Sequence, residues 1–226
     1  YGLLMMWLIA TLLAESLPQR QSLHPLAIAR NYGELLTHPV FILVTSASGL
    51  IYAGLMAYLS SSSFIYISLL GVPVQYFGLI FLTGVIGYVS GSAISARLSG
   101  RRDSEQVMAY GICLALLAAG SLWLGGTLFP DSVAALVIPM TINATALGLV
   151  LPHAMAIALR PFPHIAGTAS SLLGFIQMSL SAVASAVVGG FLTDSARPLL
   201  GGMAVITLLA AALTALSWRH YRRTSP

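Results

Sequence analysis

The segment PVFILVTSASGLIYAGLMAYLSS, residues Pro39–Ser61, contains no Asp, Glu, Lys or Arg and is long enough to cross a lipid bilayer. A transmembrane helix needs about 20 predominantly apolar residues, because each residue advances the helix by about 1.5 Å. Hydrophobic residues form 58% of the chain and charged residues only 7%, a balance too apolar for a soluble domain. Five further segments share these properties: Val74–Ala96, Gln106–Leu128, Ser132–Leu159, Ile165–Thr193 and Pro198–Ser217. The sequence therefore predicts an all-α membrane protein with six spanning helices.

The sequence before the first span divides into a short apolar piece and a linker. Tyr1–Ala14 covers only about 20 Å as a helix, so we interpret it as part of a transmembrane helix and the chain as the C-terminal part of a longer polypeptide. In the linker, Tyr32 and Leu35 fall on one helical face, which predicts an amphipathic helix on the membrane surface. Thr37 is the expected N-cap of the first span. The predicted divisions are residues 1–14 (partial helix), 15–38 (cytoplasmic linker), 39–217 (six-helix bundle) and 218–226 (cytoplasmic tail).

The arginines predict the orientation of the spans. The chain has ten arginines and no lysine, and nine of the arginines lie in the connections and tail that share one side of the predicted topology. Arg197 lies on the other side. This bias over short loops is typical of the positive-inside rule, so we expect the linker and the C-terminus to be cytoplasmic. The net charge of +4 is scattered over these loops rather than gathered on one basic face, which argues against a nucleic-acid partner.

The sequence contains no pattern that predicts an enzyme. Nucleophile-elbow, zinc-protease, phosphate-loop and dinucleotide-binding motifs are all absent from suitable contexts. The single cysteine, Cys113, lies in the middle of a span without metal-ligand residues at useful spacing, and the five histidines are dispersed. We therefore expect no catalytic residues, no metal site and no cofactor.

Polar side chains are unevenly distributed among the spans. The third and sixth spans carry few of them, whereas the first, fourth and fifth carry several Ser, Thr, Asn, Gln or Tyr residues. Polar groups inside a bilayer need partners or water, so the richer helices are expected to face a cavity and the third and sixth to face lipid. A pattern that recurs after three helices is typical of transporters built from repeats.

Four residues are candidates for the wall of a substrate cavity: Tyr52, Asn143, Gln177 and Ser181. Asn143 and Gln177 are large polar side chains in apolar spans, and Ser181 shares a helical face with Gln177. Other roles remain open for each of them. Asn143 and Gln177 also suit hydrogen bonds between helices, Ser181 suits close helix packing, and Tyr52 suits an anchor near a membrane interface.

The fourth span contains the candidates for a gating element: Pro139, Gly148 and Pro152. Each proline removes a backbone hydrogen-bond donor and disrupts the preceding turn. A helix weakened at two points suits gating, and static bends that help packing are the alternative. The central parts of the spans contain no Asp, Glu or Arg, so a proton-coupling carboxylate is expected outside this chain.

Three motifs carry a family resemblance. The run Ser95–Arg102, with Arg97, Gly100, Arg101 and Arg102, resembles the cytoplasmic loop motif of the major facilitator superfamily, although Arg97 replaces the usual acid. The segment Ala166–Gln177 resembles the eleventh helix of the Bcr/CflA drug-efflux transporters. Gly148–Ala154 resembles their tenth helix, in which Asn is more usual than His.

This resemblance implies the end of helix six, the central loop and helices seven to twelve of a twelve-helix transporter. It implies export of small amphipathic drugs or antibiotics in exchange for protons, in a bacterial inner membrane, together with an N-terminal six-helix bundle as partner. In such a protein helices seven, eight, ten and eleven face the central cavity. Two alternatives remain: an exporter of a small metabolite such as a sugar or amino acid, and a non-transporting membrane interaction subunit. Polar faces on matching helices of two repeats favour a transporter.

Overall fold

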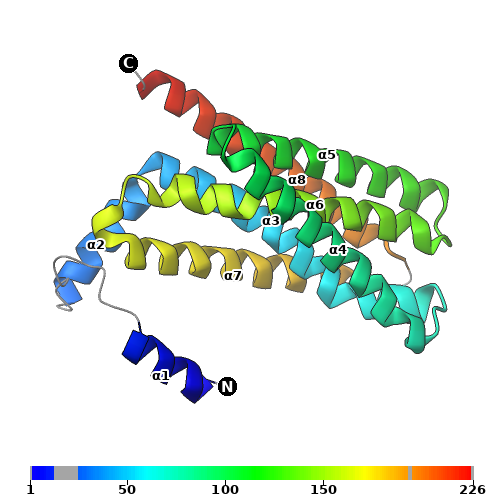
Figure 1. Ribbon diagram of the computed structural model, residues 1–226. Helices are drawn as coiled ribbons and strands as arrows, with labels where there is room; N and C mark the ends of the chain where they lie inside the picture. Colours follow the sequence, from blue (N-terminus) through cyan, green and yellow to red (C-terminus); the bar gives the residue numbers. More distant parts are fainter. Residues whose placement is uncertain (1, 13–24, 193–194, 225–226) are drawn as a thin grey trace.

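The computed structural model describes residues 2–12, 25–192 and 195–224, and its regular structure over these ranges is helical throughout (Figure 1). α1 lies apart from the bundle, and its large apolar side chains, such as Trp7, are exposed. The helices are α1 (Gly2–Leu12), α2 (Pro25–Thr37), α3 (Pro39–Ser63), the π-helix η1 (Phe64–Leu69), α4 (Val74–Ser99), α5 (Ser104–Leu128), α6 (Val133–Leu159), the short 3-10 helix η2 (Pro163–Ile165), α7 (Ala166–Phe191) and α8 (Arg197–Thr224).

Six helices in the described ranges are long and apolar enough to cross a membrane, which confirms the predicted all-α membrane architecture. The first span is longer than predicted, because α3 continues beyond Ser61 and passes directly into η1. The serine run at this point was expected to begin a loop. Instead Ser60 Oγ donates to Ala57 O at 3.0 Å and Ser62 Oγ donates to Leu59 O at 2.8 Å. These bonds satisfy the hydroxyls within the helix, so the serines do not end it.

α3 and α6 form the centre of the bundle. α3 packs against α7, α8 and α6, whereas α6 packs against α5, α4 and α3. In the most apolar stretch of α3 and of α6, 56% of the residues are buried, compared with 17% in α4 and 22% in α7. α4 and α7 are therefore flanking helices, each held mainly by one neighbour, and α5 and α8 pack together behind the central pair.

The apolar core consists of two clusters, one toward each end of the bundle. Near α2 the first cluster contains Leu35, Phe41 and Phe162, which are all at most 2% exposed. The second cluster contains Tyr66 and Leu200 near the opposite end. Helices from both ends of the chain contribute to each cluster, so burial of these side chains fixes the bundle as one unit.

The junction between α2 and α3 differs from the prediction that Thr37 caps the first span. His38 is the N-cap, and its Nδ1 accepts a hydrogen bond from Phe41 N at 3.4 Å. Thr37 Oγ1 instead donates to Gly33 O at 2.8 Å within α2. Thr37 is the last residue of α2, so its hydroxyl bonds back into that helix. Residues 15–24 of the predicted linker lie outside the described residues.

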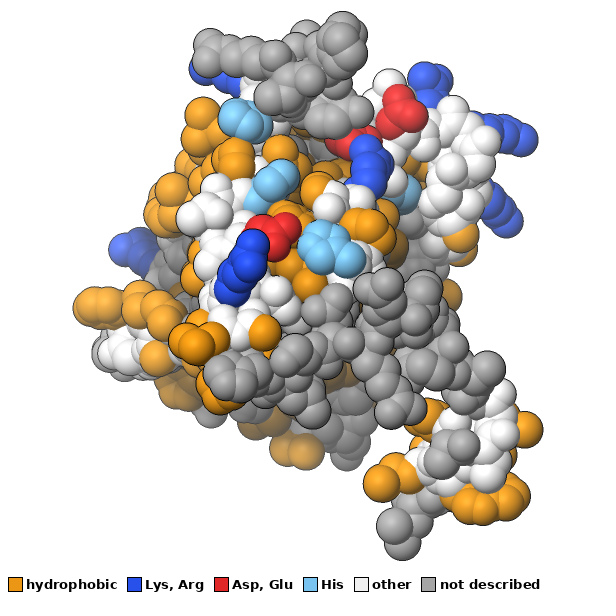
Figure 2. Space-filling model, turned by 90° about the vertical axis from the view of Figure 1, so that its left-hand side faces the viewer, with side chains coloured by type: hydrophobic (Ala, Val, Ile, Leu, Met, Phe, Trp, Pro, Cys, Tyr) orange, Lys and Arg blue, Asp and Glu red, His pale blue; other side chains and the backbone are white. Residues whose placement is uncertain are grey.

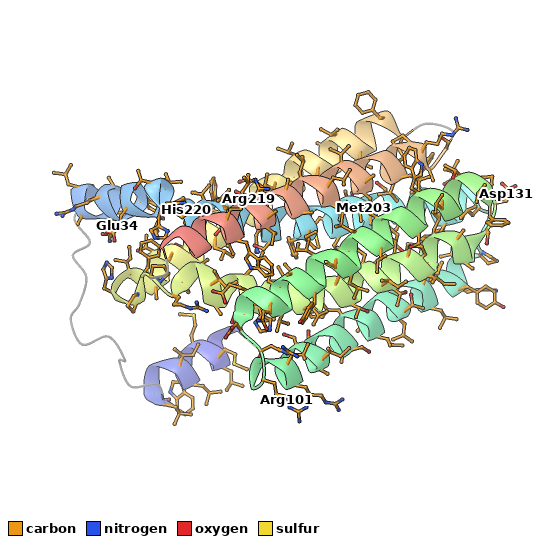
Figure 3. The ribbon with its side chains drawn as sticks, turned by 90° about the horizontal axis from the view of Figure 1, so that it is seen from above. Glu34, Arg101, Asp131, Met203, Arg219 and His220 are labelled. Atoms are coloured by element: carbon orange, nitrogen blue, oxygen red, sulfur yellow. The ribbon has the colours of Figure 1, made fainter. Side chains whose placement is uncertain are left out.

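The arginines whose side chains are described gather at one end of the bundle, with Arg197 as the exception (Figure 3). Figure 2 shows this end, where Arg, His and Glu side chains lie over an apolar base. Among the described residues there, Arg160 Nη1 forms an ion pair with Glu105 Oε1 at 2.7 Å, and His164 Nε2 lies 3.6 Å from Glu34 Oε1. The bundle therefore has one basic end, which we call the arginine end.

Candidate functional site

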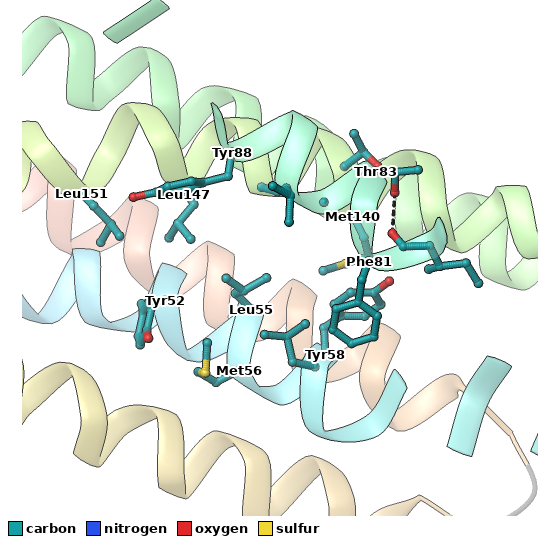
Figure 4. A pocket seen from close by; sticks show the side chains of 16 residues that line it. Tyr52, Leu55, Met56, Tyr58, Phe81, Thr83, Tyr88, Met140, Leu147 and Leu151 are labelled. Atoms are coloured by element: carbon teal, nitrogen blue, oxygen red, sulfur yellow. Dashed lines mark hydrogen bonds between the residues drawn. The ribbon is translucent and has the colours of Figure 1, made fainter. Parts of the chain in front are cut away.

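A cavity of about 350 Å³ opens between α3, α4 and α6 (Figure 4). α3 supplies one wall with Tyr52, Leu55 and Tyr58, and α4 faces it with residues such as Phe81 and Tyr88. α6 closes the space between them with Met140, Thr141, Ala144, Leu147 and Leu151. Tyr58 and Phe81 lie at one end of the cavity, whereas Tyr52 and Leu151 lie toward the other (Figure 4).

The cavity wall is apolar and uncharged. Its lining residues include no Asp, Glu, Lys, Arg or His. The hydroxyls of the two lining threonines already donate to backbone carbonyls and are not available as donors to a ligand. Thr83 Oγ1 donates to Ile80 O at 2.8 Å, and Thr141 Oγ1 donates to Val137 O at 2.9 Å. The hydrogen-bond donors that the wall can offer are therefore its tyrosines: Tyr52, Tyr58 and Tyr88.

Small residues bring α4 and α6 together and so set the width of the cavity. A Cβ added to Gly87 would lie 2.5 Å from Thr141 O, and one added to Gly148 would lie 2.6 Å from Tyr88 O. At Gly91 an added Cβ would collide with Thr145 O. At all three positions the backbone of α4 lies against the backbone of α6, as in membrane helix pairs that pack through small residues. We call this contact the glycine seam.

The structure separates the four cavity candidates. Tyr52 lies on the cavity wall. Asn143 is only 2% exposed and does not line this cavity. It precedes Ala144 by one position and therefore points about 100° away around the helix. Its Nδ2 has no hydrogen-bond partner among the described residues.

Gln177 and Ser181 lie between α7 and α3 rather than on this cavity wall. Gln177 Nε2 donates to Ser48 Oγ at 3.5 Å, and Gly49 allows close approach because an added Cβ there would be 3.5 Å from Gln177 Cα. Ser181 is 5% exposed, and its Oγ donates to Gln177 O at 2.7 Å. The Gln177 contact joins α7 to α3, whereas the Ser181 bond lies within α7.

The gating candidates lie within one uninterrupted helix. α6 runs from Val133 to Leu159 with Pro139 and Pro152 inside it. Pro139 is buried and Pro152 is exposed, whereas Gly148 forms part of the glycine seam. The three residues thus have different surroundings, and the one with a clear packing constraint is Gly148.

The loop motif lies at the arginine end. α4 ends at Ser99, and the backbone amides of Arg101 and Arg102 donate to Leu98 O at 2.8 and 2.9 Å. The side chains of Arg97, Arg101 and Arg102 are exposed, as is Gly100. The motif therefore forms a tight basic turn between α4 and α5.

A model of the Major Facilitator Superfamily matches residues 1–185. The chain belongs to the Major Facilitator Superfamily. It is 29% identical over 215 residues to the uncharacterized MFS-type transporter YdgK of Bacillus subtilis, a match that covers 94% of this chain and 52% of that protein. It is 30% identical over 190 residues to a bicyclomycin resistance protein homolog of Haemophilus influenzae, with 81% and 46% coverage. The chain spans about half the length of these curated relatives.

Three of the long helices, α3, α4 and α6, line the cavity. The resemblance places helices seven, eight, ten and eleven around the central cavity, which correspond to α3, α4, α6 and α7 here. Three of these four helices line the observed cavity, and α5 and α8 contribute no lining residue. The resemblance included α4 among these helices, but the sequence analysis named no cavity residue on it. The available signal was the spacing of Phe81, Gly84 and Tyr88 on one helical face.

Proposed function

We propose that the full-length protein exports small amphipathic drugs or antibiotics in exchange for protons, and that this chain supplies its C-terminal bundle. The observation that carries the proposal is the uncharged, tyrosine-lined cavity between α3, α4 and α6. An apolar wall with a few hydrogen-bonding groups is typical of sites for small molecules. A strongly charged cargo would lose its hydration there without gaining a countercharge. The name of the Haemophilus influenzae relative supports a drug as cargo.

Alternating access is the transport mechanism that suits this architecture. In major facilitator proteins one bundle rocks against the other around a site near the middle of the membrane. The bundle in this chain is suited to such motion as one unit, because shared core clusters and the glycine seam hold its helices together. The second bundle belongs to the half of the curated relatives that this chain does not match.

Proton coupling requires an ionisable group within the membrane. The central parts of the six spans contain no Asp, Glu or Arg. We therefore assign the coupling carboxylate to the N-terminal bundle. We also infer a bacterial inner membrane location with the arginine end and the C-terminus in the cytoplasm, on the basis of the arginine bias.

A drug-susceptibility panel on bacteria expressing the full-length protein tests the proposal, and bicyclomycin is the first compound to include. Resistance that disappears when the proton gradient is dissipated is the expected result. Ala144→Phe should abolish resistance, because Ala144 is 3% exposed on the cavity wall and a phenyl ring would fill the cavity. Ala156→Phe is the matched control, because Ala156 is exposed on the same helix.

Two results would contradict this function. Unchanged susceptibility to every drug at full expression would favour the metabolite exporter, which a metabolite-release assay on the same cells would then detect. Equal resistance from the Ala144→Phe and Ala156→Phe proteins would show that cargo does not use this cavity.

A further inference from the structure

Two buried tyrosines form a hydroxyl pair at one end of the cavity. The hydroxyl oxygens of Tyr58 in α3 and Tyr66 in η1 lie 3.1 Å apart, within hydrogen-bond distance. Their rings meet edge to face, with centroids 6.2 Å apart and an interplanar angle of 87°. Tyr58 lines the cavity and is 9% exposed, whereas Tyr66 is not a lining residue and is 0% exposed. The two partners thus have different access to cargo.

The π-helix fixes Tyr66 in this position. A π-helix closes its hydrogen bonds from residue i to i+5 and is found frequently at functional sites. Here Tyr66 O accepts a hydrogen bond from Val72 N at 2.8 Å, and the Tyr66 ring packs on Phe77 of α4 at a centroid distance of 6.4 Å. Phe77 in turn packs edge to face on Phe81 of the cavity wall, at 5.0 Å. Tyr66 therefore has backbone and ring contacts that hold its hydroxyl against Tyr58.

The direction of the hydrogen bond follows from the surroundings of each hydroxyl. Among the described residues, neither hydroxyl has another hydrogen-bond partner. If Tyr58 donated to Tyr66, the Tyr66 proton would be buried without an acceptor, which is costly. If Tyr66 donates to Tyr58, the buried Tyr66 proton has an acceptor and the remaining proton belongs to Tyr58, the partner whose side chain lines the cavity. The second arrangement is therefore the favoured one.

We propose that Tyr58 is a specificity-determining residue that presents its O–H to the cavity and selects cargo with an uncharged oxygen acceptor, such as a carbonyl or ether. Tyr66 is its positioning residue. The Tyr66 hydroxyl donates to the Tyr58 oxygen, so the Tyr58 proton remains available to a cargo acceptor. The threonine hydroxyls of the wall donate to backbone carbonyls and do not compete for this role. The inference rests on the proposed transport function and adds the chemical class of cargo.

A stability comparison tests, without any cargo, whether the Tyr58 and Tyr66 hydroxyls form a buried hydrogen-bonded pair. Thermal unfolding of the full-length protein should show the largest fall in Tm for Tyr58→Phe, because that change leaves the Tyr66 hydroxyl buried and unpaired. Tyr66→Phe should lower Tm less, because Tyr58 lines the cavity and its hydroxyl is not fully buried when it loses its partner. The double variant should recover part of the Tyr58→Phe loss, because no polar group then remains unpaired. Equal losses from the two single variants without recovery in the double variant would show that the two hydroxyls do not form such a pair, and would overturn the inference.

A matched pair of probes tests the selectivity. Benzophenone and diphenylmethane carry the same two phenyl rings, and only benzophenone has a carbonyl acceptor. Radiolabelled binding to the full-length protein in lipid nanodiscs, with partition into empty nanodiscs subtracted, should favour benzophenone about five-fold. This factor corresponds to a neutral hydrogen bond of about 1 kcal/mol. Tyr58→Phe should reduce the ratio to about one, whereas Tyr110→Phe should leave it unchanged, because Tyr110 is 47% exposed on α5, away from the cavity.

The outcomes separate this inference from the proposed function. A ratio that survives Tyr58→Phe, or the absence of a saturable preference for benzophenone in the natural protein, overturns the inference even where the protein exports drugs. A preference that depends on Tyr58 in a protein that exports no drug supports the inference and refutes the proposed function.

Discussion

Gly148→Ala tests whether the glycine seam sets the geometry of the cavity. The added Cβ would lie 2.6 Å from Tyr88 O and 2.7 Å from Ser92 N, both backbone atoms of α4. Ordinary contact begins near 3.4 Å, so α4 and α6 must separate by about 0.8 Å. Because backbone atoms cannot rotate away, the strain must be relieved by moving a whole helix. Overpacking of this kind costs about 1 to 3 kcal/mol, and α4 has little contact beyond α6 to compensate.

Thermal unfolding of the full-length protein in detergent measures this effect. Gly174→Ala in α7 is the matched control, because an added Cβ there meets nothing within 4 Å. The control should be neutral or slightly stabilising, since alanine favours a helix interior by about 0.5 to 1 kcal/mol over glycine. We expect a lower Tm and weaker drug export only for Gly148→Ala. Equal stability and export in both variants would refute the packing argument.

Three further predictions concern other parts of the chain. Burial lowers the pKa of His38 below 6.5, so the folded protein binds fewer protons at this residue than the unfolded chain does. The free energy of unfolding should therefore fall as the pH drops through 6.5. His38→Asn should keep the helix cap and lose this pH dependence in a series of unfolding curves. In a Cys113→Ala background, Asp131→Cys should react with an impermeant maleimide in intact cells and Asp103→Cys should not; the reverse pattern would invert the topology. Gln177→Ala should lower the free energy of unfolding by about 0.6 kcal/mol and leave the set of exported drugs unchanged. A changed set of exported drugs at equal protein abundance would instead show that Gln177 contacts cargo.

The spans were predictable because bilayer thickness imposes a long apolar run on each of them. The ends of the spans were less predictable, because Ser and Thr side chains, which commonly mark loops and helix caps, can also form hydrogen bonds within a helix. The serines before Phe64 resemble a loop, yet Ser60 and Ser62 bond back to helix carbonyls and α3 continues into η1. His38 replaces Thr37 as the cap because Thr37 bonds back into α2.

The cavity was harder to predict, because in a membrane helix both the lipid face and an apolar cavity face are hydrophobic. Polarity alone singled out Asn143, whereas packing on the glycine seam turns the face of Ala144 toward the cavity. Tyr52, one of the candidates for a substrate-cavity wall, lines the cavity between α3, α4 and α6. Thr83 and Tyr88 were not named as candidates, because the sequence analysis did not use the spacing of Phe81, Gly84 and Tyr88 in the second span.

Proton-driven transport by the purified full-length protein is the most direct test of the central claim. Liposomes that contain the protein and carry a pH gradient should move radiolabelled bicyclomycin against its concentration gradient. Dissipating the pH gradient should stop this movement. The cavity-filling Ala144→Phe protein should be inactive, whereas the Ala156→Phe protein, which is changed at an exposed position of the same helix, should be active. Transport by both variants, or no gradient-dependent movement of bicyclomycin or of any drug to which the cells show resistance, would contradict the account.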